Sequence, residues 1–342
     1  MNKTANACLH LPSKIDSMRA VLLMICIVLL ASCTSQQCRE SVEPETIALK
    51  TERLELELFE SKSATDVEGF LESHPDFAQL FLHADQYPAD SILAKRMFGL
   101  IQNPSIDTLY EESVNAFEDF DKVVKALEEG LGRLKVYYPN APSPVIQTCV
   151  TGLYNDLFIS NEHIMIGMDF FVGPEATYKP QQIPNYILQR YTTEHLAASI
   201  LQFISSQYIQ NTKGESMLAE MIDFGKSYYL LSKILPCTEE NILIGYTDEE
   251  WGDIFEHENI IWANFVENEL LFETSHQIKQ KFIGERPTVY EIGDKCPGRI
   301  GRWVGWQIIN AYAQNTGATV KEIMAETDYN LIFSKSGYKP GR

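Results

Sequence analysis

Basic residues are scarce in this chain of 342 residues, which has 28 Lys and Arg against 47 Asp and Glu and a formal net charge of -19 at pH 7. Nucleic acids and anionic bilayer surfaces are bound through Lys and Arg, so this balance excludes both as partners. Acidity also favours solubility, and it therefore identifies no substrate. With 45% hydrophobic and 11% aromatic residues, the chain can still bury a substantial core.

The common sequence signatures of catalysis are also absent. The chain has no GxSxG nucleophile elbow, no GxxxxGK[ST] phosphate loop, no GxGxxG dinucleotide fingerprint and no HExxH zinc motif. It has no CxxC pair either, so its cysteines form no metal or redox pattern. The sequence therefore predicts no cofactor, no metal site and no catalytic residue of a known type.

No apolar run approaches the roughly 20 residues that a membrane-spanning helix needs. The ten apolar residues Val21–Leu30, which follow Arg19, are typical of a signal-peptide core. Leu30-Ala31-Ser32-Cys33 comes next and resembles the bacterial lipobox, in which the cysteine is acylated and becomes the new N-terminus. We therefore predict a cleaved signal peptide over residues 1–32, with Met18 as an alternative start, and a lipid anchor, palmitate included, on Cys33. The alternative is an ordinary cysteine beside a secretory cleavage site.

The mature chain is predicted to consist of a lipidated tether over residues 33–45, which are polar and unpatterned, and one α+β domain over 46–342. By analogy with lipoprotein sorting, Thr34 in place of aspartate argues against retention in the inner membrane and favours the outer membrane. This compartment permits disulfides, and the sequence leaves two disulfides and no disulfides both open. The cysteines concerned are Cys38, Cys149, Cys237 and Cys296.

Periodicity predicts a mostly helical α+β fold with a small sheet near its middle. Apolar and charged residues alternate over Ile47–Phe59, which predicts a strand. From Asp66 to about Gly130 the apolar spacing is helical, with breaks at His74-Pro75 and Asn103-Pro104. Further predicted elements are β-rich runs at Val145–Val150 and His163–Met168 as a hairpin or small sheet around Asn155-Asp156, and helices through Leu196–Tyr208, Met221–Leu235, Ile254–Leu270 and Arg299–Asn315.

Glu194-His195, followed about 25 positions later by Glu220 and Asp223, is the most suggestive group of polar residues. A zinc protease places two histidines four residues apart on one helix and a third ligand on a later helix. The layout here is similar, but the fourth position beyond His195 is Ser199, which is a poor zinc ligand. We therefore favour a structural interpretation, in which His195 is a helix-flank histidine with a satisfied hydrogen bond and the two acidic residues form a solvated helix face.

A glycine-rich segment, Pro297-Gly298-Arg299-Ile300-Gly301-Arg302-Trp303-Val304-Gly305, opens the last predicted helix. Gly301 and Gly305 lie four apart on one helix face, where small residues let another backbone approach closely. We interpret the segment as a tightly packed helix. The alternative is that it lines a groove, with Arg299 or Arg302 pairing with an acidic partner.

The chain resembles the gliding motility-associated lipoprotein GldB family of the Bacteroidetes. The resemblance spans roughly residues 45–325 and is most specific in the segment that contains Pro297, Gly298, Arg299, Gly301, Trp303 and Gly305. The other matching features are the lipobox at Cys33, Met221–Tyr229 with Gly225, Lys226 and Tyr229, Leu235-Pro236, Gly245-Tyr246-Thr247 and Arg286-Pro287.

The family resemblance implies an outer-membrane lipoprotein facing the periplasm, associated with the envelope machinery that moves and secretes surface adhesins. The family is in turn distantly similar to predicted zincin-like zinc proteases, in which a later helix carries Glu-Gly. Phe224 stands where that glutamate would precede Gly225, so the resemblance implies a zincin-like domain without its zinc ligands.

We therefore expect a noncatalytic envelope protein that binds protein partners. The alternatives are a divergent metal-dependent hydrolase that uses Glu194, His195, Glu220 or Asp223, and a lipoprotein that binds a small molecule or glycan in the degenerate cleft.

Overall fold

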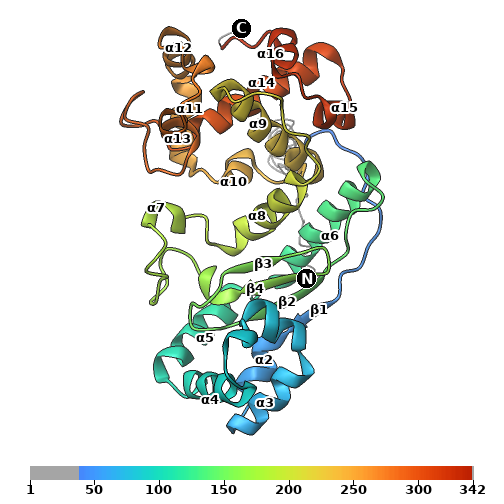
Figure 1. Ribbon diagram of the computed structural model, residues 1–342, viewed down its shortest axis with the longest axis vertical. Helices are drawn as coiled ribbons and strands as arrows, with labels where there is room; N and C mark the ends of the chain where they lie inside the picture. The colour runs from blue at the N-terminus through green and yellow to red at the C-terminus, as the bar shows by residue number, and fades with distance from the viewer. Residues whose placement is uncertain (1–37, 341–342) are drawn as a thin grey trace, which may run out of the picture. The chain divides into compact units, whose positions relative to one another are not determined.

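The computed structural model describes residues 38–340 (Figure 1). The predicted signal peptide, Cys33 and the start of the predicted tether lie outside the described residues. The described residues from Arg39 onward form one compact unit, which is mostly helical with a small mixed sheet, as the α+β prediction required. None of the described helices combines the length and the apolar character needed to cross a bilayer.

Four short strands form the sheet in the order β1-β2-β4-β3. They are β1 Thr51–Arg53, β2 Val145–Cys149, β3 Leu157–Ile159 and β4 His163–Gly167. The two β-rich runs are indeed strands, but β2 and β4 pair in parallel, with Ile146 opposite Ile164. Of the two predicted alternatives, the small sheet is confirmed, and a hairpin between these two runs is not. The hairpin is β3–β4, because the chain after Asn155-Asp156 forms an additional strand antiparallel to β4.

The strand predicted over Ile47–Phe59 is confirmed only at Thr51–Arg53, because Leu54–Phe59 forms helix α2. Alternating leucines also contain the i, i+4 spacing of a helix, and the burial of these leucines shows which spacing the fold uses. Leu54 and Leu58 are fully buried, whereas Leu56, which a strand would place on the same face, is 47% exposed.

Helices fill the chain between β1 and β2, and both predicted proline breaks are confirmed. Helix α3 ends before His74, and α5 begins at Pro104, with the Asn103 side chain accepting a hydrogen bond from the backbone N–H of Ser105. The elements are α3 Ala64–Ser73, the π-helix η1 Phe77–Phe81, the 3₁₀ turn η2 Ala84–Gln86, α4 Asp90–Ile101, α5 Pro104–Ala116 and α6 Phe120–Tyr137.

The chain after the sheet is again helical, and three of the four helices predicted there are continuous. The fourth, through Ile254 and Ile261, divides at His257 into the two helices α11 and α12. Both isoleucines are nevertheless buried, as their periodic spacing predicted. The elements are η3 Met168–Phe170, α7 Asn185–Leu188, α8 Thr193–Ser206, α9 Met217–Ile234, α10 Glu240–Ile244, α11 Asp248–Glu256, α12 Glu258–Glu267, η4 Leu270–Phe272, α13 His276–Ile283, α14 Ile300–Thr316, α15 Val320–Ala325 and α16 Tyr329–Ser336.

The two faces of the sheet contact different apolar cores. Ile146, Ile164 and Ile166 pack into the larger core with α6, α8, α9 and α14. Cys149 and Met165, whose side chains alternate to the other face, pack into a smaller core with α2, α3 and α4. The sheet therefore separates the α2–α4 helices from the rest of the domain, as Figure 1 shows.

Helices α9 and α14 pack at the centre of the larger core, and glycine determines how closely they approach. A Cβ atom on Gly305 would lie 1.8 Å from the carbonyl oxygen of Met221, and one on Gly225 would lie 2.3 Å from the carbonyl oxygen of Gly305. Trp306 is fully buried beside this contact, and its ring stacks on Tyr228 with centroids 5.6 Å apart. The glycine spacing thus serves tight helix packing, which the sequence interpretation favoured over a groove.

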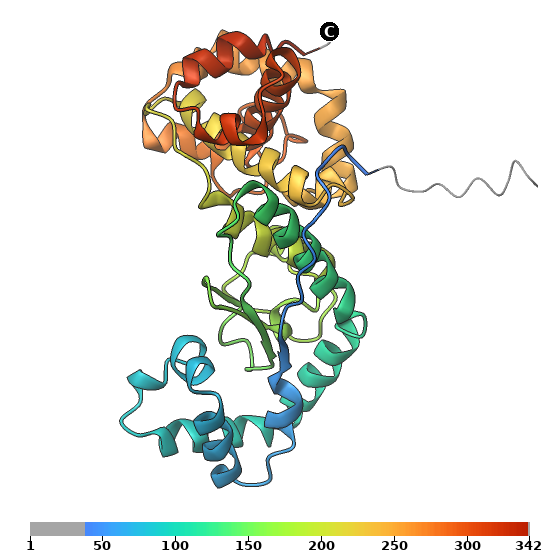
Figure 2. The same cartoon turned by 90° about the vertical axis from the view of Figure 1, so that its right-hand side faces the viewer.

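Before β1 the chain runs extended along the domain (Figure 2). The backbone N–H of Arg39 donates to the carbonyl oxygen of Pro236 at 2.9 Å, and that of Glu45 donates to Gly132 at 3.2 Å. The described part of the predicted tether is thus attached to the domain. Cys38 and Cys237 are disulfide-bonded, whereas Cys149 and Cys296 are buried free thiols, which differs from both alternatives that the sequence left open.

Candidate functional site

A cleft of about 620 Å³ lies between α8, α9 and the start of α14, and it contains part of the predicted site. Ser199 from α8 and Glu220 and Asp223 from α9 line it, together with Phe224 and Arg302. The i, i+3 spacing of Glu220 and Asp223 places both carboxylates on the face of α9 that borders the cleft. The structure therefore brings together three polar positions that the sequence comparison with zinc proteases had singled out.

Asp223 is held by contacts that fix the loop before α9. Its carboxylate accepts hydrogen bonds from the backbone N–H of Thr212 at 2.9 Å and from the Thr212 hydroxyl at 3.1 Å. Its nearest cation is the Lys226 ammonium at 3.9 Å. Burial raises the pKa of the Asp223 carboxyl, while Thr212 and Lys226 act in the opposite direction. The main contacts of this carboxylate are thus structural.

Lys226 on α9 is fully buried. Its ammonium donates to the carbonyl oxygens of Gln210, at 3.0 Å, and Glu326. Desolvation by burial lowers the pKa of Lys226, and Asp223 and Glu326 partly offset this effect. Lys226 therefore joins α9 to two loops that lie far apart in the sequence.

Glu194 and His195 do not line this cleft. Glu194 is exposed in the first turn of α8 and borders a different cavity, which is lined by residues 115–123. The Nδ1 atom of His195 lies 2.8 Å from the Thr192 hydroxyl, at the N-terminal end of the helix. The four residues proposed as a degenerate site are therefore divided between separate places in the fold.

Burial lowers the pKa of His195 to about 4, and the nearby cations Arg190 and Arg299 add to the effect. The folded protein thus favours neutral His195, whereas the unfolded chain binds a proton near the ordinary value of 6.5. The stabilisation from the neutral imidazole is present above pH 6.5 and is lost as pH falls towards 4.

A His195→Gln chain should accordingly show a shallower decline of stability between pH 6.5 and 4 than the natural sequence, by up to about 1.4 kcal/mol per pH unit. Denaturant unfolding at several pH values measures this difference. Asp169, whose pKa burial raises to about 6, acts with the opposite sign in the same range. The comparison is therefore between the two chains at each pH, and parallel profiles would contradict the prediction.

Arg299 from the glycine-rich segment is buried and binds the C-terminal end of α10 through hydrogen bonds. Its guanidinium donates to the carbonyl oxygens of Ile244 at 2.7 Å and Gly245 at 2.9 Å, and it lies over the Tyr246 ring. Arg299 also lies 3.5 Å from Glu285. Arg299 is the N-cap residue of α14 and has a φ of 63°, a left-handed conformation that is uncommon outside glycine. These contacts give Arg299 a structural role in packing α14 against the end of α10.

Glu285 is an important residue that the sequence reasoning did not identify. Its carboxylate accepts two hydrogen bonds from Arg190, at 2.8 and 3.2 Å, and lies 3.9 Å from Arg302. Burial opposes its ionisation, but Arg190 and the other arginines together lower its pKa. A single glutamate carries no pattern in the sequence, and only its position beside Arg286-Pro287 of the family motif pointed to this segment.

The remaining residues of the family motif are also held in packing contacts within the fold. A Cβ atom on Gly298 would lie 1.8 Å from the carbonyl oxygen of Arg286, and Pro297 forms an isolated bridge with Thr288. Trp303 is fully buried, and the Tyr229 ring packs beneath the Lys233 ammonium at 5.2 Å. The motif thus stabilises the junction of α9, α13 and α14.

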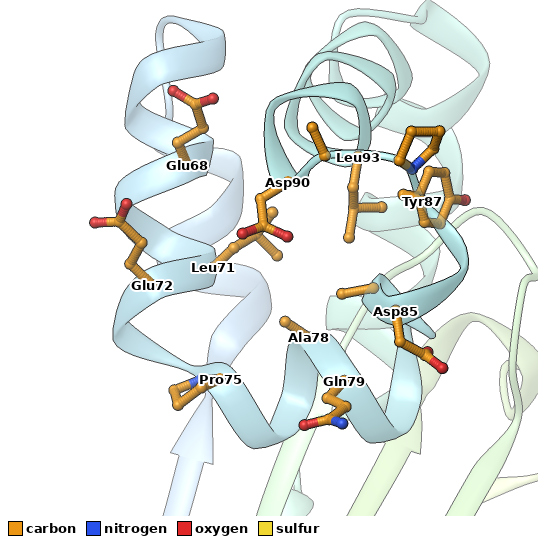
Figure 3. Close-up of a pocket in the computed structure, with 13 residues that line it drawn as sticks. Glu68, Leu71, Glu72, Pro75, Ala78, Gln79, Asp85, Tyr87, Asp90 and Leu93 are labelled. Atoms are coloured by element: carbon orange, nitrogen blue, oxygen red, sulfur yellow. The ribbon is translucent and has the colours of Figure 1, made fainter.

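Another cavity, of about 670 Å³, lies between α3, η1 and α4 (Figure 3). Leu71, Ala78 and Leu93 form an apolar floor. Four carboxylates surround the floor, and none has an ion-pair or hydrogen-bond partner among the described residues. They are Glu68, Glu72, Asp85 and Asp90. We call this cavity the acidic groove. No sequence pattern marks it, because residues of α3, η1, η2 and α4 create it together.

Comparison with known proteins identifies one family. The family model described as gliding motility protein GldB matches residues 35–340, nearly the whole chain. The name of that model denotes a lipoprotein, and therefore a protein of the cell envelope. No curated protein and no solved structure matches the chain. The match agrees with the resemblance carried by the glycine-rich segment, and it shows that the chain belongs to the gliding motility protein GldB family.

Proposed function

We propose that this protein is a noncatalytic lipoprotein, anchored through Cys33 in the outer membrane and facing the periplasm, that supports the gliding and adhesin secretion machinery by binding a protein partner. The family match supports the role in gliding. The disulfide-bonded Cys38 and Cys237 support an oxidising compartment such as the periplasm.

The arrangement of the former catalytic candidates supports a noncatalytic role. In a zincin-like site, a base and the metal ligands must surround one reacting centre. Here Glu220 forms an ion pair with Lys279 at 3.1 Å, Asp223 holds Thr212, and His195 lies outside the cleft that these carboxylates line. Each of these side chains has a structural partner, so the protein uses them to hold its helices and loops together.

The acidic groove is the observation that carries the protein-binding proposal. Its apolar floor offers contact area, and its four unpartnered carboxylates favour a cation. Glu285 and Glu291 have arginine or lysine partners, whereas single exposed carboxylates such as Glu111 and Glu267 do not, so the groove is distinguished by four carboxylates gathered around one apolar floor. The groove therefore fits a segment of a partner protein that bears Lys or Arg beside an apolar side chain.

Neutralising the groove tests this function in a gliding strain that lacks its own family member. The groove variant changes all four rim carboxylates to their amides. The substitutions are Glu68→Gln, Glu72→Gln, Asp85→Asn and Asp90→Asn. We expect the natural chain to restore colony spreading and the groove variant to lose most of it, at equal abundance in the outer-membrane fraction.

A matched variant removes the same number of charges from exposed positions outside the groove, including one in the first turn of a helix, as Asp90 is. It combines Glu111→Gln, Glu118→Gln, Asp121→Asn and Glu267→Gln. This control should restore spreading. Full restoration by the groove variant would refute docking in the groove.

A Glu194→Ala, His195→Ala chain should also restore spreading, and its failure would favour a divergent metal-dependent hydrolase.

A further inference from the structure

Helix α11 ends in three side chains of the types that can bind a metal ion, outside the cleft and the acidic groove. The side chains of Asp253, Glu256 and His257 each offer one ligand atom, and these atoms lie within 4.8 Å of one another. Their spacing of i, i+3 and i+4 places them on one face of the last turn. Asp253 and His257 are half-buried, while Glu256 is exposed.

The ring of His257 is held by one hydrogen bond, which leaves its second nitrogen without a hydrogen-bond partner among the described residues. Its Nδ1 atom lies 2.8 Å from the carbonyl oxygen of Asp253. Because a carbonyl only accepts, Nδ1 must carry the proton, and the neutral ring then has its lone pair on Nε2. Histidines that bind metals commonly donate their second ring N–H to a backbone carbonyl in this way, which fixes both the tautomer and the ring angle.

The break between α11 and α12 creates this arrangement. His257 closes α11 through its backbone N–H to Asp253, and its own carbonyl oxygen accepts from Ile260 and Ile261 to begin α12. The side chains of Asp253 and His257 border a cavity of about 120 Å³ that is backed by apolar residues, including Ile254 and Ile261. The cavity leaves space beside the two side chains.

A cation already interacts with one of these carboxylates. The Lys295 ammonium lies 3.2 Å from Oδ1 of Asp253, and its side chain is 64% exposed. An exposed ammonium is held weakly and can swing into solvent. A divalent ion at the cluster would carry twice its charge and contact three ligands at once, so metal and Lys295 would compete for Asp253.

We propose that Asp253, Glu256 and His257 form a binding site for a divalent transition-metal ion, with Zn²⁺ the best match. Two carboxylate oxygens and one imidazole nitrogen are ordinary zinc ligands, and the tetrahedral preference leaves one position for water. Mg²⁺ and Ca²⁺ prefer oxygen ligands throughout and are disfavoured by His257. The ion would join the end of α11 to the start of α12. Because one coordination position is open to water, the bound ion would exchange readily with ions in solution.

The test is a Zn²⁺ titration by calorimetry of the full-length protein in detergent after treatment with chelator. We expect one Zn²⁺ per chain at this site, with no comparable heat from Mg²⁺. Glu256→Gln, which alters only an exposed side chain, and His257→Gln should each weaken binding by about tenfold or more. His276→Gln, which removes an exposed histidine from α13, is the matched control and should bind as the natural chain does.

Lys295→Met provides an outcome that a purely structural role would not produce. Removal of the competing ammonium should strengthen Zn²⁺ binding several-fold. Unchanged circular dichroism and unfolding midpoints without metal would show that each variant folds. The proposal fails if the natural chain binds no Zn²⁺, or if Glu256→Gln and His257→Gln keep the affinity of the natural chain.

Discussion

Replacement of Gly305 by alanine is expected to destabilise the domain by about 3 kcal/mol, a large effect for one methyl group. The added Cβ atom would lie 1.8 Å from the carbonyl oxygen of Met221 and 2.4 Å from its carbonyl carbon. Both are backbone atoms of α9, which cannot rotate away as a side chain can. Helices α9 and α14 would therefore have to separate. The stacked rings of Tyr228 on α9 and Trp306 on α14 would then lose contact with each other.

Denaturant unfolding followed by circular dichroism measures this loss, and Gly252→Ala is the matched control. Gly252 lies inside α11, where a Cβ atom would meet nothing within 4 Å. Alanine there should stabilise the chain by about 0.5–1 kcal/mol, because glycine is the poorer helix former. The same substitution is thus expected to have opposite signs at two helical glycines. An unfolding midpoint for Gly305→Ala equal to that of the natural chain would contradict the close packing of α9 and α14.

Gly225 adds a second step to this prediction. Its Cβ atom would lie 2.3 Å from the carbonyl oxygen of Gly305, so both glycines serve the same helix contact. Once one alanine has separated the helices, the second has less contact left to break. The double variant should therefore cost less than the sum of the two single variants.

Long amphipathic helices were predictable because many residues repeat the same spacing. The spacing through Leu196–Tyr208, Met221–Leu235 and Arg299–Asn315 locates α8, α9 and α14 closely. Short segments gave less information. The leucines of Leu54–Phe59 fit a strand and a helix equally well, and only their burial against the sheet identifies the helix.

The sites were less predictable, because they depend on contacts between distant segments. Glu220 and Asp223 share a cleft as their spacing suggested, but the adjacent sequence positions of Glu194 and His195 say nothing of the direction in which α8 presents them. The metal cluster illustrates a different difficulty. An HExxH motif would place a second ligand four residues after His257, where Ile261 stands, whereas the proposed ligands precede it, at Asp253 and Glu256.

Lys226 shows how a family motif can have a structural meaning that no sequence pattern conveys. In the sequence it stands between a glycine and a serine, as many exposed lysines do. In the fold its ammonium is fully buried and donates to Gln210 and Glu326. Next to these contacts, two backbone hydrogen bonds join the same two loops, from Gln210 to Met324 and from Lys213 to Thr327, each at 3.0 Å.

Lys226→Met is accordingly expected to destabilise the domain by about 3 kcal/mol. Methionine fills much of the volume but donates no hydrogen bond, so the carbonyl oxygens of Gln210 and Glu326 lose this donor and Asp223 loses the ammonium 3.9 Å away. Denaturant unfolding measures the loss. Lys125→Met is the control, because Lys125 has a side chain that is 76% exposed and should change stability by no more than about 0.5 kcal/mol.

The location of the damage distinguishes a loop anchor from a general contribution to the core. If Lys226 holds the two loops together, the backbone amides of Gln210 and Lys213 should exchange with solvent faster in Lys226→Met, by more than the global loss of stability requires. Adding Asp223→Asn should recover part of the loss, because it removes the carboxylate that has lost its cation. Uniform exchange across the domain and no recovery would instead mean that Lys226 matters only as buried volume.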